Sequence, residues 1–180
     1  MNNKDILDRY TYKNDKLIKK KISDADAIDY EKNRDIINEI ILWKISRSVE
    51  ISDGTIDKIH SLRCSIQSPL DAVDSMEVKT LLGELLNSKG IKIAMASTIL
   101  HFFYPSVFPI IDQRAYRELT GDNMPEFYSK DKNQRYTELY LHYIENCYKY
   151  NMEIFPEAEF ECIDKILYQL DKEKNNQVNY

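Results

Sequence analysis

Apolar residues recur every three or four positions over most of the chain, beginning at Tyr30. This spacing is typical of helices that bury one face. Short polar, Gly- or Pro-containing stretches separate the periodic segments. The expected helical segments are approximately 30–44, 56–66, 75–86, 93–103, 113–120, 136–150 and 157–172. Because no stretch alternates as a strand would, the pattern predicts an all-α helical bundle of roughly seven to nine helices.

The same pattern predicts the domain organisation. A chain of 180 residues is long enough for one domain with a sizeable core. Residues 1–27 are polar and of mixed charge, which predicts an arm or a short helix. Residues 28–172 are expected to form a single domain, and residues 173–180 a frayed tail. Within the domain, Asp53-Gly54 is expected to separate the first two helices, and the second is expected to stop before Pro69.

Charge limits the function classes. The net charge of −5 argues against a protein that coats nucleic acid by charge alone. A local basic face is still possible at the Lys-rich segment 16–21, at Lys89 with Lys92, or at Arg114 with Arg117. The alternative for segment 16–21 is a solvated helix face or a tail.

Cysteine usage and the absence of long apolar runs bear on the compartment. Three scattered cysteines form no disulfide framework, and their odd number fits a reducing compartment. The polar N-terminal segment has no apolar core of the signal-peptide kind, and no apolar run reaches the roughly 20 residues of a membrane span. We therefore expect a cytoplasmic protein with no membrane partner, no metal and no cofactor. The pattern leaves the oligomeric state open.

Residues 81–119 are the most informative part of the sequence. They predict a helix, a tight turn in which Gly90 is free to take a positive φ, a second helix, and an extended segment flanked by prolines. A further helix follows, which Asp112 opens as N-cap and Gly121 ends. Two helices joined by a glycine turn can present backbone N–H groups and a positive helix end to an anion. A DNA phosphate is the natural ligand, and Lys89 and Lys92 would add positive charge there.

The sequence GIKIAMASTILHFFYPSVFPIIDQRAYREL, residues 90–119, resembles the helix-hairpin-helix and catalytic-aspartate region of the DNA glycosylase superfamily. That superfamily includes endonuclease III-like and oxoguanine-type enzymes. Gly90 and Ile91 match the start of the hairpin, and Ala96 matches an alanine of the second helix. Ile110-Ile111-Asp112 matches the element that carries the catalytic aspartate. An early Trp43-Lys44 pair and the C-terminal helix resemble a subgroup of small bacterial proteins.

The resemblance implies a DNA glycosylase-like fold, DNA as partner, and Asp112 as the catalytic residue. Base excision needs the target base outside the stack, where an ionised carboxylate stabilises the cationic sugar or activates water. It also implies phosphate contacts from residues 89–92, namely Lys89, Gly90, Ile91 and Lys92. Gln113 and Arg114, which follow Asp112, could contact phosphate or hold the carboxylate.

Two positions depart from the family pattern. Lys92 replaces the second hairpin glycine, where a positive φ would now be strained. Ala94 stands where bifunctional members carry a Schiff-base lysine. We therefore expect a monofunctional enzyme without lyase activity. Lys44 is the candidate substitute amine.

Each candidate also has a structural interpretation. Asp112 could be only an N-cap, worth about 1 kcal/mol. Arg114 could form a surface salt bridge, and Lys44 could extend from the edge of the core to solvent. The aromatic residues that could stack on an extruded base are more often core, and we expect most of them to be buried. They are Trp43, Phe102, Phe103, Tyr104 and Phe108.

Two residue types receive only a structural interpretation or none. Cys147 and Cys162 are expected to be buried thiols. The histidines His60, His101 and His142 show no metal-like spacing and receive no role.

Two rival functions remain beside the glycosylase. One is a non-catalytic nucleic-acid-binding module on the same fold, and the other is a protein-interaction domain for which the fold is a scaffold. Catalysis requires Asp112 to face a cleft with aromatic walls. Binding alone requires a positive hairpin face, whereas an interaction domain would expose an apolar patch.

Overall fold

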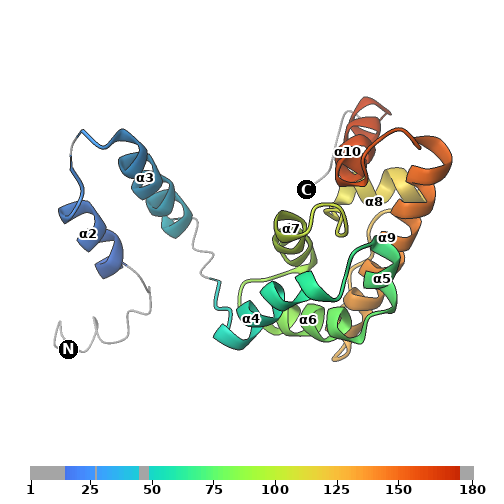
Figure 1. Ribbon diagram of the computed structural model, residues 1–180, viewed down its shortest axis with the longest axis horizontal. Helices are drawn as coiled ribbons and strands as arrows, with labels where there is room; N and C mark the ends of the chain where they lie inside the picture. Colours follow the sequence, from blue (N-terminus) through green and yellow to red (C-terminus); the bar gives the residue numbers. More distant parts are fainter. Residues whose placement is uncertain (1–14, 27, 45–48, 175–180) are drawn as a thin grey trace. The chain divides into compact units, whose positions relative to one another are not determined.

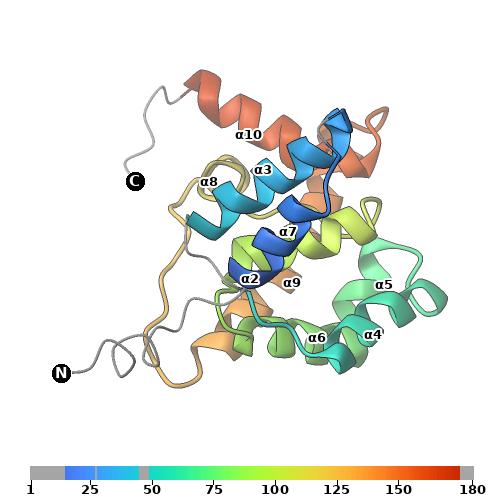
Figure 2. The same ribbon diagram turned by 90° about the vertical axis from the view of Figure 1, so that its left-hand side faces the viewer.

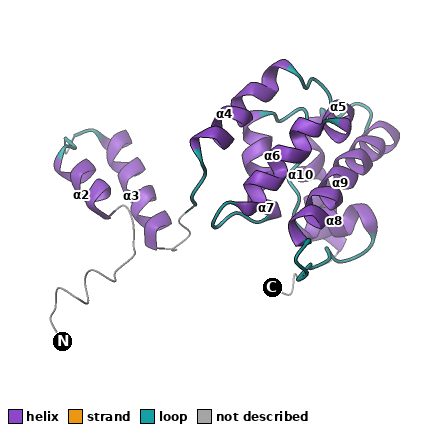
Figure 3. Cartoon of the chain, turned by 90° about the horizontal axis from the view of Figure 1, so that it is seen from below, coloured by secondary structure: helices purple, strands orange, loops and turns teal. Residues whose placement is uncertain are grey.

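The computed structural model describes residues 15–26, 28–44 and 49–174 and divides the chain into two compact units (Figure 1). Unit 1 ends at Val49, and unit 2 begins at Glu50. The described residues form nine α-helices, α2 to α10, and two short 3-10 helices, η1 and η2 (Figure 3). They contain no β-strand, and Glu50 and Lys89 form an isolated antiparallel bridge. The predicted all-α helical bundle is confirmed.

Unit 1 contains α2 (Asp15–Ser23) and α3 (Tyr30–Lys44). The Lys21 Nζ atom lies 2.8 Å from a carboxylate oxygen of Glu39, which joins the two helices. Ile18 of α2 and Ile36 of α3 are buried. The sequence pattern instead assigned α3 to the same domain as the rest of the chain. Residues 1–14 of the predicted arm and 175–180 of the predicted tail lie outside the described residues.

Unit 2 contains the remaining helices. Their bounds are α4 (Asp53–Ser61), η1 (Leu62–Cys64), α5 (Pro69–Asp74), α6 (Met76–Asn87), α7 (Ile93–Phe103), α8 (Gln113–Thr120), α9 (Lys132–Ile154), η2 (Phe160–Cys162) and α10 (Ile163–Lys174). Figures 1 and 2 both show α10 and α8 at the end of unit 2 opposite α4 and α6. No helix of the described residues combines the length and the apolar character needed to cross a membrane.

The prediction of a break at Asp53-Gly54 is wrong, because these residues begin α4. Ser52 is the N-cap, and its Oγ accepts a hydrogen bond of 3.1 Å from the Thr55 amide. Such a cap determines where the first turn starts, and a glycine costs little there. Pro69 is likewise part of a helix and not a break between helices. It occupies the first turn of α5, behind a capping box between Ser68 and Asp71.

Later helices follow the pattern more closely. Asp112 caps α8, and Gly121 ends it with a φ of 80°, as predicted. The last helix, α10, begins at Ile163 rather than at residue 157, because a turn and η2 come first. Its last turn includes Glu173 and Lys174, which the sequence pattern had assigned to the tail.

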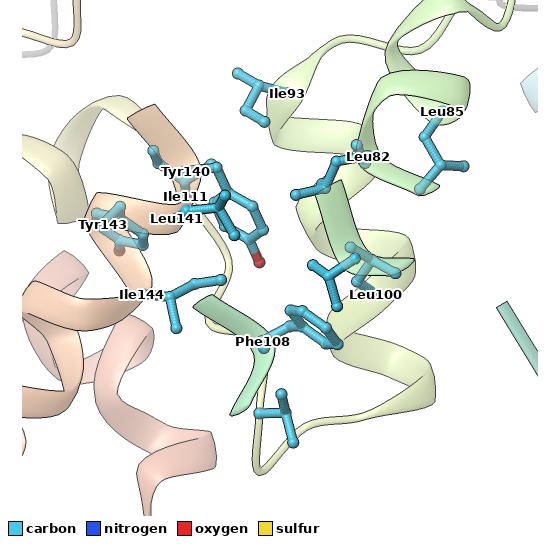
Figure 4. Packing of buried hydrophobic residues seen from close by; sticks show 14 of the residues in the cluster. Leu82, Leu85, Ile93, Leu100, Phe108, Ile111, Tyr140, Leu141, Tyr143 and Ile144 are labelled. Atoms are coloured by element: carbon cyan, nitrogen blue, oxygen red, sulfur yellow. The ribbon is translucent and has the colours of Figure 1, made fainter. Parts of the chain in front are cut away.

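The core of unit 2 is built around α9, which packs against α5, α6, α7, α8 and α10. Figure 4 shows side chains of α6, α7 and α9 meeting those of Phe108 and Ile111. Tyr140 and Tyr143 of α9 are almost fully buried. Their rings lie nearly parallel, with centroids 6.3 Å apart. The non-helical segment between α7 and α8, residues 104–112, thus runs through the interior at Phe108 and Ile111, and we call it the extended segment.

A candidate nucleic-acid interface and carboxylate site

The turn between α6 and α7, residues 88–92, is tight and anchored in the core. We call it the α6–α7 turn. The Ile91 amide donates to the Ser88 carbonyl over 3.2 Å, and Gly90 has a φ of 83°. Only glycine adopts such a φ without steric cost. Ile91 within the turn and Ile93 directly after it are buried and hold the C-terminal side of the turn against the core. The predicted positive φ at Gly90 is confirmed.

Lys92 is the N-cap of α7 and has an ordinary extended backbone, with φ −110° and ψ 173°. Replacing a glycine by lysine here therefore causes no backbone strain. A lysine side chain has no acceptor atom, and it makes no capping hydrogen bond. The N–H groups in the first turn of α7 thus receive no acceptor from their own N-cap side chain. Lys92 and Ala94 are exposed beside them.

Lys89 is also exposed, and it forms an ion pair with Glu50, which lies in the segment before α4. Its Nζ lies 3.4 Å from a carboxylate oxygen of Glu50, and its side chain is 67% accessible. Exposed pairs of this kind contribute between about 0 and 1 kcal/mol. An incoming anion can therefore replace Glu50 at low cost.

Asp112 is half-buried at the N-terminus of α8. Its Oδ1 accepts a hydrogen bond of 2.8 Å from the Ala115 amide. Burial raises the pKa of this carboxyl above its usual value, and the nearby charge of Asp164 raises it further. Hydrogen bonds from the amides of Ala115 and Arg114, together with the Arg114 charge, lower the pKa in part. The N-cap role foreseen for Asp112 is confirmed, and its carboxyl binds a proton more readily than an exposed aspartate.

The extended segment that leads to Asp112 is held by side chains of three helices. Its peptide groups from Phe108 to Ile111 exchange five hydrogen bonds with them, where secondary structure would otherwise supply backbone partners. The five bonds are His101 Nδ1 with the Phe108 carbonyl (2.8 Å), Tyr140 hydroxyl to the Pro109 carbonyl (2.8 Å), Tyr143 hydroxyl to the Ile110 carbonyl (3.1 Å), Ile110 amide to Asp164 Oδ2 (3.3 Å) and Ile111 amide to Ser97 Oγ (3.2 Å).

Sequence reasoning missed these five side chains as a group. His101 was given no role, and it fixes the extended segment. A usable signal was present on two helices, because Ser97 and His101 are four residues apart on the apolar face of α7, and Tyr140 and Tyr143 three apart on α9. Polar atoms on a buried face need partners, and the nearest non-helical backbone supplies them.

Arg114 belongs to a buried ion network at α8 and α10. Its Nη1 lies 3.2 Å from Oδ2 of Asp171, a carboxylate with no exposed surface. Arg117 donates to the same carboxylate through Nε and Nη2, each over 2.7 Å. The Arg114 guanidinium also lies over the Tyr168 ring, 5.6 Å from its centroid. Arg114 therefore forms a salt bridge, in the interior rather than at the surface. That Arg114 contacts phosphate stays a prediction.

Gln113 is exposed, and its Oε1 accepts a hydrogen bond of 3.0 Å from the Met124 amide. This bond joins the start of α8 to the loop that follows it. Lys44 is the last residue of α3 in unit 1. The side chains of Trp43 and Lys44 lie outside the described residues, so the proposed amine role of Lys44 stays a prediction.

The expectation that the aromatic residues are mostly buried is correct for Phe108 and wrong for two others. Phe102 and Phe103 are 79% and 42% exposed. The buried face of α7 follows residues 93, 96, 97, 100 and 101, which turns Phe102 away from the core. Cys147 is buried as expected, and burial raises the pKa of its thiol. Cys162 is only half-buried.

Two grooves on unit 2 lie away from this site. One of about 510 Å³ lies between α6 and α9 and includes Lys79, Asn87 and Glu138 in its lining. The other, of about 320 Å³, lies between α4 and α6. Neither includes Asp112 or the α6–α7 turn. Residues 15–26, 28–44 and 49–174 hold no group of three or more His, Cys, Asp or Glu able to bind a metal ion.

No protein-family model matches the chain, and neither the curated proteins nor the solved structures include a match to it.

Proposed function

We propose that the chain is a DNA-binding protein of the helix-hairpin-helix glycosylase type that acts in base-excision repair in a bacterial cytoplasm. The α6–α7 turn binds a DNA phosphate, and Asp112 is the carboxylate of a monofunctional glycosylase. The observation that carries the proposal is the hydrogen bond between the Ile111 amide and Ser97, because it joins Asp112 to the helix that begins at the turn.

The turn has the features of an anion site. The first-turn N–H groups of α7 have no acceptor from the Lys92 side chain, and the helix end carries partial positive charge. Gly90 lets the backbone turn sharply without a side chain in the way. Lys89 and Lys92 are exposed on either side of it. These features favour a phosphate contact that positions DNA without reading its sequence.

The aspartate lies close to that turn. Ser97 comes four residues after Ile93, the first residue of α7, which is about 6 Å along the helix axis. The Ser97 hydroxyl accepts a hydrogen bond from the Ile111 amide, so Ile111 lies beside Ser97 of α7. Asp112 is the next residue along the chain. The proposal places a nucleotide beside a phosphate bound at the turn within reach of the carboxylate.

The chemistry suits an aspartate and needs no amine. Water adds to C1′ of the extruded nucleotide while the bond from C1′ to the base nitrogen breaks, and the base leaves with the bonding electrons. Asp112 stabilises the positive charge on the sugar and accepts the proton that water loses. Ala94 cannot form a Schiff base, so the reaction stops at the abasic site.

One observation favours a second candidate, a non-catalytic DNA-binding module. Oδ1 of Asp112 already accepts the Ala115 amide, which is what a purely structural N-cap does. The two candidates share the phosphate contact and differ only in base release.

The first test is binding to a short duplex that carries an abasic-site analogue, compared with the undamaged duplex over a salt titration. We expect preference for the analogue. Replacing Lys89 and Lys92 by Glu is expected to weaken both complexes and to reduce the salt slope by roughly one unit per lysine. A matched control replaces Lys132 and Lys149, two exposed lysines of α9, by Glu. Equal losses in both double variants would refute the turn as the phosphate contact.

The second test is base release from a panel of modified duplexes. Asp112→Asn is expected to abolish release while DNA affinity stays equal or rises, because a negative charge is removed. Tight binding without release by the unmodified protein would favour the non-catalytic module. Absence of binding at low salt would refute both and favour a protein-interaction domain.

A further inference from the structure

Asp164 is a buried carboxylate in the first turn of α10. The residue is only 6% exposed. Oδ2 accepts a hydrogen bond of 3.3 Å from the Ile110 amide, which lies two residues before Asp112. A carboxylate from the C-terminal helix is thus tied to the backbone that leads into the candidate catalytic residue.

The charge of Asp164 is poorly compensated. Its Oδ1 is buried and has no hydrogen-bond partner among the described residues. Within the same residues no Lys, Arg or His forms an ion pair with it, whereas the nearby Asp171 carries two arginines. A buried carboxylate without an ion-pair partner is costly, and the position of Asp164 at the N-terminus of α10 offsets only part of that cost. A neutral side chain would accept the single hydrogen bond from the Ile110 amide without the cost of burying a charge.

We propose that Asp164 is a positioning residue for Asp112. Its buried carboxylate holds the Ile110 amide and thereby the start of α8, and its negative charge acts on the Asp112 carboxyl that follows. The inference deepens the proposed function, and it rests on Asp112 being the reactive group of the site.

The groups that face Asp112 come from three helices. Arg114 of α8 supplies positive charge, and its guanidinium is shared with Asp171. Tyr143 of α9 interacts electrostatically with Asp112, and burial keeps the pKa of its hydroxyl well above the usual value, so it is neutral. Asp164 of α10 supplies negative charge. Among these groups, Asp164 is the one that makes loss of a proton from Asp112 harder.

The consequence concerns proton transfer. A general base works best when its pKa approaches the working pH, and an exposed aspartate is far too acidic for that. Burial of Asp112 and the Asp164 charge both move its pKa in the required direction. A structural tie alone would need the oxygen of Asp164 but not its charge.

The experiment compares the full-length protein with Asp164→Asn, which keeps an oxygen for the Ile110 amide and removes the charge. The pKa of Asp112 is measured from the pH titration of its side-chain carboxyl carbon by NMR. We expect the variant to lower that pKa by roughly half a unit or more. The matched control is Glu161→Gln in η2, which removes a negative charge near the same helix end and is expected to leave the Asp112 pKa unchanged. An unchanged Asp112 pKa in Asp164→Asn would overturn the proposal.

A second measurement needs only the wild-type protein. The Ile110 amide is expected to exchange slowly with solvent, and the Asp112 carboxyl carbon to titrate above the value of an exposed aspartate. Fast exchange at Ile110, or a single-step Asp112 curve at the value of an exposed aspartate, would refute the coupling even if the variant did not fold. Neither readout depends on base release, so failure of the glycosylase proposal and failure of the coupling are distinguishable.

Discussion

The hydroxyl of Tyr140 donates a hydrogen bond of 2.8 Å to the carbonyl oxygen of Pro109 inside the core of unit 2. A side chain of α9 thereby supplies the hydrogen-bond partner that a neighbouring strand would supply to this backbone carbonyl in a sheet. Because the bond is buried on both sides, losing it leaves a carbonyl without any partner. The route of the chain towards Asp112 therefore depends on a few buried polar atoms.

Tyr140→Phe is expected to destabilise the protein by about 1–3 kcal/mol, the cost of leaving the Pro109 carbonyl unsatisfied. The free energy of unfolding, measured with urea, tests this. Tyr128→Phe is the matched control, because Tyr128 is 84% exposed and its loss is expected to stay within about 0.5 kcal/mol. Equal stability of the two variants would mean that water replaces the lost hydroxyl.

Asp112→Ala and Asp112→Asn are expected to separate the cap from the chemistry. Alanine removes the acceptor of the Ala115 amide and costs about 1 kcal/mol, whereas asparagine retains the cap. Both variants lose base release if the proposed function holds. Urea unfolding and a release assay on the same preparations give the two numbers. If the Ala and Asn variants were equally stable, the hydrogen bond to Ala115 would contribute nothing to α8.

The pH dependence of stability follows from the raised pKa of Asp112. Because the folded protein holds this proton more tightly than the unfolded chain, the contribution of Asp112 to stability is fully present below pH 3.8. That contribution is lost as the pH rises through the folded-state pKa. The stability of Asp112→Asn relative to the wild type is therefore expected to increase over that window. Unfolding experiments at several pH values measure the difference, and an opposite slope would mean that the pKa is lowered.

Asp171→Asn is expected to cost about 3–5 kcal/mol, because it leaves the Arg114 and Arg117 guanidinium groups without their buried anion. Glu145→Gln is the control, since it breaks an exposed ion pair with Lys149 on one helix and is expected to cost at most about 0.5 kcal/mol. Both values come from urea unfolding. A loss below about 1 kcal/mol for Asp171→Asn would mean that the network stabilises the protein no more than an exposed ion pair does.

Two glycine-to-alanine changes are expected to have opposite signs. A Cβ at Gly83 or at Gly121 meets nothing within 4 Å, so packing does not separate them. Gly83 lies inside α6, where alanine stabilises a helix by about 1 kcal/mol. Gly121 has a φ of 80°, where alanine costs about 1–2 kcal/mol. Thermal unfolding of the two variants measures the contrast, and the same sign in both would contradict it.

The features predicted correctly from the sequence are those that depend on near neighbours. Asp112 as an N-cap, Gly121 as a helix end and Gly90 at positive φ each follow from the backbone requirements of a few adjacent residues. The same local reasoning missed Ser52 and Ser68 as caps. The Gly in one case and the Pro in the other were interpreted as breaks, although both are compatible with a first helical turn.

The features that could not be predicted depend on distant residues. Asp164 meets the Ile110 amide across 54 positions, and no periodicity links the two. The division of the chain into two units after Val49 was not predicted, for a similar reason. Ile37 and Ile41 of α3 continue an apolar pattern, yet they are 55% and 50% exposed. A pattern predicts that a helix has an apolar face, and it does not indicate which element covers that face.

The five side-chain bonds to the extended segment also have a consequence for the order of folding. Their donors and acceptors lie on α7, α9 and α10, and the last of these helices begins more than 50 residues after the segment. A nascent or partly unfolded chain without α10 lacks one of the five contacts, and its extended segment is held only by side chains of α7 and α9. The full set of contacts around the residues before Asp112 is therefore complete only after the last helix has packed.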